Sequence, residues 1–122
     1  MKGNKEIISR TIKRLGILAH LKGYRYIVYS VDLLINDFNR INSLMGIYGD
    51  IAKEFNTTTV RAERAIRHAI EVGWSRANVD FVNELFGYGV DANKGKPTNG
   101  EFLATVADYI LMTRQGKEYE GK

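Results

Sequence analysis

The sequence contains no cysteine, a single proline and only two histidines among its 122 residues. Without cysteine there is no disulfide framework, no thiolate zinc site and no cysteine nucleophile. No apolar run approaches the roughly 20 residues that a membrane-spanning helix needs, and the start "MKGNKEIISR" lacks the apolar centre of a signal peptide. We therefore expect a cytoplasmic protein that does not enter a membrane.

The composition is that of a folded domain. Hydrophobic residues make up 44% of the chain and charged residues 26%, a balance that argues against disorder. The length suits one domain, so we expect a single domain over residues 1–122. The net charge of +4 and the isoelectric point near 9.4 are a modest basic excess, which is weak evidence for an anionic partner. The positions of the charges matter more than their sum.

Apolar residues recur every three or four positions, which predicts an all-α domain. About six helices are expected, over residues 5–15, 22–43, 49–55, 58–74, 78–86 and 98–113, followed by a frayed polar tail. A short β-strand at "YRYIVYSV" competes with the second helix, but the periodicity continues through Ile41 and favours the helix. Thr98 and Glu101 have the spacing of a capping box at the start of the last helix.

Residues 49–74 read as a helix-turn-helix, whose second helix has one apolar face. That face consists mainly of small residues, Ala62, Ala65, Ile66, Ala69, Ile70 and Gly73. Small residues let another helix approach closely, and we expect the helix at 49–55 to be that neighbour. Asn56 suits a left-handed turn, and Thr57 or Thr58 suits the following N-cap.

The opposite face of the second helix carries Arg61, Arg64, Arg67, His68 and Glu71, with Glu63 at its edge. The second helix of such a motif lies in the major groove of DNA. There Arg61 and Arg64 could each donate two hydrogen bonds to a guanine, and Glu63 could accept one from a cytosine amino group. Arg67 and His68 lie further along the helix, where phosphates are nearer.

Three other interpretations stay open at this point. The face could be solvated, with its arginines paired to Glu63 and Glu71, as in an i,i+4 pair of Arg67 with Glu71. It could meet an acidic partner as a helical protein-interaction module. An enzyme using His68 and Glu71 is the weakest interpretation, because nothing in the sequence places a nucleophile or a carboxylate beside either histidine. We expect no cofactor and no metal, and His20 reads as a surface or capping residue. Periodicity alone favours the solvated face.

The motifs are more specific than the periodicity. The segments "DIAKEFNTT", "ERAIRHAIEV", "WSR", "LFGY", "KPTN" and "EF" with "VAD" after it, in this order and spacing, resemble the C-terminal effector domains of the stage-zero sporulation protein A family. "AHLKGYRY" upstream resembles the second helix of that family. The resemblance covers about residues 5–114. It implies a compact six-helix domain that binds DNA in response-regulator transcription factors at the start of endospore formation.

The resemblance also implies partners. Domains of this family bind short boxes of the TGTCGAA type in double-stranded DNA, two copies on adjacent boxes, and both activate and repress transcription. One of their surfaces meets the principal sigma factor of RNA polymerase. The intact proteins carry an N-terminal receiver domain, which has no counterpart in this sequence, so the resemblance implies an isolated effector domain.

By position, the family's base-contacting residues correspond to Arg61, Glu63 and Arg64. Backbone or edge contacts are expected from Thr58, Val60, Arg67, His68, Lys94, Lys96 and Arg114. The family has a serine where this chain has Val60, which puts a hydroxyl contact there in doubt. For Lys94 and Lys96, a solvated loop is the equal alternative. The sigma-factor surface corresponds to Val79, Phe81, Asn83, Phe86 and Val90, although periodicity favours core packing for the two phenylalanines. Trp74 is expected to anchor the core.

Overall fold

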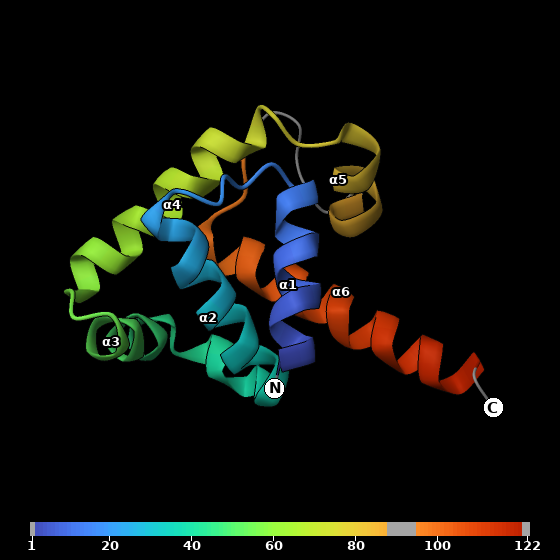
Figure 1. Ribbon diagram of the computed structural model, residues 1–122, viewed down its shortest axis with the longest axis horizontal. Coiled ribbons are helices and arrows are strands. Elements are labelled where there is room, and N and C mark those ends of the chain that lie inside the picture. Colours follow the sequence, from blue (N-terminus) through green and yellow to red (C-terminus); the bar gives the residue numbers. More distant parts are fainter. Residues whose placement is uncertain (1, 88–94, 121–122) are drawn as a thin grey trace.

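The computed structural model describes residues 2–87 and 95–120, and the side chains of residues 4–87 and 95–114. Within these ranges it contains helices and no strand, arranged as a single compact domain, so the all-α prediction is confirmed (Figure 1). The elements are α1 (Lys2–Arg14), α2 (Lys22–Asn36), the 3-10 helix η1 (Phe38–Asn42), α3 (Leu44–Glu54), α4 (Thr59–Trp74), α5 (Val79–Phe86) and α6 (Asn99–Glu120). In the part of the chain so described, no helix combines the length and the apolar character of a bilayer span.

Helices α4, α5 and α6 begin where the sequence predicts, because a side chain caps each of them. The Thr58 hydroxyl accepts the backbone N–H three residues later at 3.1 Å, and Asn78 Oδ1 does the same at 2.9 Å. At α6 the capping box is complete: Glu101 Oε1 accepts the Thr98 N–H at 2.9 Å, and Thr98 Oγ1 accepts the Glu101 N–H at 3.1 Å. Each cap satisfies a backbone donor that the helix leaves unpaired.

The prediction of one helix over 22–43 is wrong, since α2 ends at Asn36. Asp37 is extended, with φ −155°, and its side chain accepts the backbone N–H of Asn39 at 3.2 Å, which starts the separate helix η1. A short polar side chain that bonds to its own backbone competes with helix continuation. Of the two apolar positions beyond this break, Phe38 is 37% exposed, whereas Ile41 is partly buried against the core.

Three other boundaries differ from the prediction. Helix α3 begins at Leu44 rather than 49, because the Ser43 hydroxyl caps it by accepting the Gly46 N–H at 3.3 Å. Helix α1 begins at Lys2 rather than at residue 5, and α6 continues to Glu120 rather than ending near residue 113. Glutamine, lysine and glutamate in the polar tail favour helix, which accounts for the longer α6.

Helix α2 is the centre of the core. It packs against α1, α4 and α6, and its side chains Ile27, Val31 and Leu34 have no exposed surface. In Figure 1, α3 and α4 lie together at one side of the molecule, and α6 starts beneath α4 and runs away from it. The arginines of α4 are exposed, on the face opposite the small residues that the central helix covers.

The small-residue face of α4 is buried as predicted, except that Ala65 is half-buried, but its closest neighbour is not α3. A Cβ placed on Gly23, in the first turn of α2, would lie 2.2 Å from the carbonyl oxygen of Ala65. A Cβ on Gly16 would lie 2.2 Å from the carbonyl oxygen of Gly73. Gly16 also has a left-handed backbone, with φ +87°. The chain segment from Gly16 to Gly23 thus contacts α4 backbone to backbone.

Replacing Gly23 with alanine should destabilise the fold. The added methyl group would overlap a backbone oxygen, which cannot move aside as a flexible side chain can, so α2 and α4 must separate. We expect Gly23→Ala to lower the free energy of unfolding by about 1–3 kcal/mol, measured by urea denaturation.

Gly49→Ala is the matched control. Gly49 lies inside α3, and a Cβ there would meet no atom within 4 Å. Alanine is a better helix former than glycine, so Gly49→Ala should raise the free energy of unfolding by about 0.5–1 kcal/mol. Equal stabilities of the two variants would contradict the proposed backbone contact at Gly23.

Candidate nucleic-acid interface

Helices α3 and α4 are joined by the short turn at residues 55–58. Asn56 has φ +54° and is the one non-glycine residue with positive φ in the described chain, as the sequence predicted for this turn. The backbone N–H of Thr57 donates to the carbonyl of Ala52 at 2.9 Å, which closes the end of α3. This arrangement is consistent with the predicted helix-turn-helix, with α3 starting five residues earlier than expected.

The N-terminal half of α4 presents cations without counter-ions. Arg61 and Arg64 are exposed, and neither guanidinium group has a hydrogen bond or an ion pair within the described residues. Val60 beside them is 56% exposed. The Thr58 hydroxyl accepts a cap hydrogen bond from the chain, and its own proton remains available to an acceptor outside the protein.

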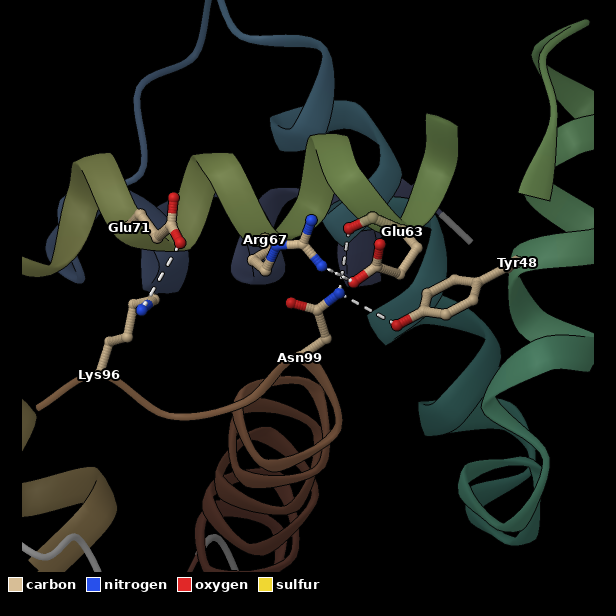
Figure 2. A network of polar contacts seen from close by, with 6 residues as sticks. All are labelled: Tyr48, Glu63, Arg67, Glu71, Lys96 and Asn99. Carbon is tan, nitrogen blue, oxygen red and sulfur yellow. Dashed lines mark hydrogen bonds and ion pairs between the residues drawn. The ribbon is translucent and has the colours of Figure 1, made fainter. Parts of the chain in front are cut away.

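The other edge of α4 is paired. Arg67 forms an ion pair with Glu63, one turn earlier, and Lys96 lies 3.5 Å from Glu71 (Figure 2). The solvated-face interpretation expected Arg67 to pair with Glu71, so the partner within α4 is a different glutamate. Both pairs are partly exposed, and such pairs contribute about 0–1 kcal/mol each.

A buried amide ties three helices together at the same edge. Asn99, the first residue of α6, is 8% exposed, and its Nδ2 donates to the Tyr48 hydroxyl at 3.0 Å and to the Glu63 carbonyl at 3.1 Å (Figure 2). Tyr48 belongs to α3 and Glu63 to α4. The bonds hold α4 at a fixed orientation above the start of α6. Beside them is a hollow of about 450 Å³ that Arg67 and Lys96 also line.

Burial raises the pKa of Tyr48 above its ordinary value, and the hydrogen bond from Asn99 opposes that rise. The pKa of Tyr29 is raised as well, by burial and then by the nearby carboxylates of Asp50 and Glu54. Both hydroxyls therefore stay neutral to a higher pH in the folded protein than in the unfolded chain.

Not all of the predicted contact residues lie near α4. Arg114 follows Asn99 by fifteen residues on α6, about 22 Å along the helix axis, and its guanidinium donates to Asn4 Oδ1 at 3.0 Å. Lys94 and Val90 lie outside the described residues. His68 is exposed on α4 and His20 is exposed before α2. Across residues 4–87 and 95–114, no three histidine, aspartate or glutamate side chains lie close enough together to hold a metal.

The expected sigma-factor surface divides into core and surface residues. Phe81 is 1% exposed, packs edge-on against Tyr109 with ring centres 5.7 Å apart, and lies 3.6 Å beneath the Arg14 guanidinium. Phe81 is therefore a core residue, as the apolar periodicity favoured, and it is too buried to belong to a contact surface. Phe86 is half-buried and packs on Trp74, with ring centres 5.2 Å apart. Val79, 70% exposed, and Asn83 face outward on α5.

Sequence reasoning missed two cations that the fold brings to Arg61 and Arg64. Lys22 and Arg25, in the first turns of α2, line a hollow of about 480 Å³ together with Arg61 and Arg64 of α4. The signal was present in "HLKGYRY", where two basic residues stand at i and i+3 at the start of an otherwise apolar helix. Their proximity to α4 follows from the contact at Gly23, which no local pattern reveals.

One comparison with known proteins finds a family match. A family model described as "Sporulation initiation factor Spo0A C terminal" matches residues 8–110. The match extends from α1 into α6, so it includes the turn at Asn56, the whole of α4 and the start of α6 that carries Asn99.

The raised pKa of Tyr48 predicts a dependence of stability on alkaline pH. Because its pKa is higher in the folded state than the unfolded value of 10.0, the stabilising contribution is complete below pH 10 and is lost as pH rises through the folded pKa. At neutral pH, Tyr48→Phe should lower the free energy of unfolding by about 0.5–1.5 kcal/mol through loss of the bond to Asn99.

Urea denaturation of both proteins from about pH 8 to about pH 11 checks this expectation. Lysines titrate alike in the two proteins, so the difference in unfolding free energy isolates Tyr48. That difference should shrink as pH rises above the unfolded pKa. A difference that stays constant over this range would contradict the assignment of Tyr48 as a buried neutral hydroxyl.

Proposed function

The chain belongs to the family of the C-terminal domain of the sporulation initiation factor Spo0A, and we propose from that premise that α4 reads promoter boxes of the TGTCGAA type in the major groove. The family is one of sporulation DNA-binding effector domains in a response-regulator context, rather than of enzymes. The proposed contact residues are supported by the exposure and the pairing of the side chains on α4.

One observation carries the proposal: Arg61 and Arg64 stand unpaired and exposed in the first two turns of α4, directly after the turn at Asn56. The N-terminal residues of a recognition helix are the ones that reach base edges. An arginine without a counter-ion presents its full set of donors to guanine O6 and N7. Two arginines at i and i+3 lie on the same side of the helix and face adjacent bases.

Glu63 is proposed to accept a hydrogen bond from a cytosine amino group, after leaving Arg67. Opening an exposed i,i+4 pair costs about 0.2–0.5 kcal/mol, less than the about 1–3 kcal/mol of a good base contact. The exchange releases Arg67 for a phosphate at the edge of the groove. The two residues would then act together, one on a base and one on the backbone.

Backbone and edge contacts are proposed for Thr58, Val60, Arg67, His68, Lys94 and Lys96. Thr58 has a free hydroxyl proton, and Val60 offers an apolar contact in place of a hydroxyl. Lys96 forms one ion pair, with Glu71, which is long and partly exposed, so a phosphate can replace Glu71 at little cost. Arg114 stands apart from α4, so any phosphate that it meets lies well beyond the bases that α4 reads.

Further partners are part of the same proposal. Val79 and Asn83, two of the exposed residues of α5, form with Phe86 and Val90 the surface for the sigma factor of RNA polymerase. A second copy binds the adjacent box, and a receiver domain controls the intact protein. The domain activates or represses transcription according to where its box lies, and it acts in the cytoplasm. A helical interaction module with an acidic protein partner is the alternative.

Arg61→Ala and Arg64→Ala should each weaken binding to a box-containing duplex by about 1–3 kcal/mol and relax discrimination at one base pair. Loss of a bidentate contact removes the preference for guanine, so a scrambled duplex should lose less. The measurement is fluorescence anisotropy with both duplexes over several salt concentrations.

His68→Ala is the matched control, since it removes an unpaired polar side chain from the same face of α4. It should weaken both duplexes by a similar factor. If the unmodified protein does not distinguish the two duplexes, or binds neither at low salt, the proposal is wrong. In that case a basic face for an acidic partner becomes the better interpretation.

Glu63→Ala should reduce the ratio of box affinity to scrambled affinity, and it should raise affinity for the scrambled duplex. The first effect is loss of the cytosine contact, worth about 1–3 kcal/mol, and the second is release of Arg67 from its carboxylate. Glu71→Ala is the control, because it releases Lys96 without touching a base contact and should raise both affinities alike. If Glu63→Ala leaves the ratio of box affinity to scrambled affinity unchanged, Glu63 does not contact a base.

A further inference from the structure

The hollow beside the turn of the helix-turn-helix is strongly basic, and we refer to it as the basic hollow. It measures about 480 Å³. Its walls come from the start of α2, the turn after α3 and the first half of α4. The lining residues are Lys22, Arg25, Tyr26, Phe55, Asn56, Thr57, Arg61, Arg64 and Ala65. Four of these are cations and none is an acid, so the hollow concentrates positive charge.

Within the part of the chain whose side chains are described, none of the four cations has a counter-ion. Lys22, Arg25, Arg61 and Arg64 are all exposed, and no hydrogen bond or ion pair involves their side-chain nitrogens. Other cations are engaged: Arg40 pairs with Asp50, Arg67 with Glu63, Lys96 with Glu71, and Arg114 bonds to Asn4. The hollow therefore gathers four cations without a counter-ion in one place.

The fold fixes the spacing of these charges. Gly23 contacts the backbone of Ala65, so the start of α2 cannot move away from α4 without losing a close contact. Lys22 precedes that contact and Arg25 follows it by two residues, while Arg64 precedes Ala65. Like charges held together in this way repel one another, and an anion in the hollow relieves that repulsion.

We propose that the basic hollow binds the phosphate backbone of DNA through Lys22 and Arg25, while Arg61 and Arg64 turn into the adjacent groove. The inference rests on the proposed function, because it takes α4 to lie in the major groove. The sugar-phosphate strands border that groove, and a wall beside the start of the recognition helix faces one of them. The planar fork of Arg25 suits two phosphate oxygens, and Lys22 adds a point charge.

The test compares the double variant Lys22→Ala/Arg25→Ala with Arg10→Ala/Lys13→Ala, which removes the same two residue types from exposed positions on α1 outside the hollow. Each phosphate contact contributes about 0.9 to the slope of log affinity against log salt. The first variant should therefore flatten the slope by about 1.8 relative to the control, for the box and for the scrambled duplex. The ratio between the two duplexes should stay that of the unmodified protein. Circular dichroism establishes that both variants are folded.

The outcomes separate this inference from the proposed function. Equal slopes for the two double variants would overturn the inference, even where the unmodified protein prefers its box. A flattened slope with no preference of the unmodified protein for the box would support the basic hollow as a backbone site and refute the proposed base reading. Arg25→Lys, which keeps the charge, should retain the slope. If Arg25→Lys instead flattens the slope of log affinity against log salt, Arg25 has a structural role and its proposed phosphate contact is overturned.

Discussion

The backbone contact of α4 with Gly16 and Gly23 is the constraint on which the rest of the structure depends. A side chain at either glycine would overlap a carbonyl oxygen of α4 at 2.2 Å, so the approach exists only because both residues lack one. The contact covers the small-residue face of α4 with the start of the central helix. It thereby turns the arginine face outward and brings the first turns of α2 level with Arg61 and Arg64. One steric requirement thus determines both the burial of one face and the grouping of charge on the other.

The polar contacts of α4 divide into two kinds with different consequences. The bonds from Asn99 to Tyr48 and to the Glu63 carbonyl are neutral, the first buried and the second partly buried, and breaking them would leave the buried Asn99 amide without a partner. The pairs Glu63–Arg67 and Glu71–Lys96 are partly exposed, and a phosphate can replace the glutamate in either pair at little cost. The orientation of the helix is therefore secured by bonds that a ligand does not disturb. Its charges are secured by bonds that a ligand can exchange.

Local sequence signals predicted a structural feature correctly wherever the residues that produce it lie within a few positions of one another. Thr58, Asn78 and the pair Thr98 with Glu101 cap helices within three residues, and Asn56 adopts its left-handed turn through its own backbone preference. The errors arose where competing signals were nearly balanced. Asp37 ended α2 inside an apolar periodicity, and the Ser43 cap outweighed two glycines in α3. The neighbour of the small-residue face was assigned to α3 because adjacent helices were assumed to pack most closely, whereas glycines distant in sequence selected α2.

The candidate site shows the same division, and it bears on the choice between the solvated-face and binding interpretations. Which residues share the outer face of α4 follows from helical spacing and was predicted. Whether those residues are neutralised depends on the whole fold, because Lys96 comes from the segment before α6 and takes Glu71, while Arg67 takes Glu63. A solvated face would distribute its glutamates among its arginines. Here both glutamates of that face are used at one edge, and Arg61 and Arg64 join Lys22 and Arg25 in a hollow that no acid lines. A fold has no stabilising use for four cations placed together and unpaired, so their grouping favours an anionic ligand.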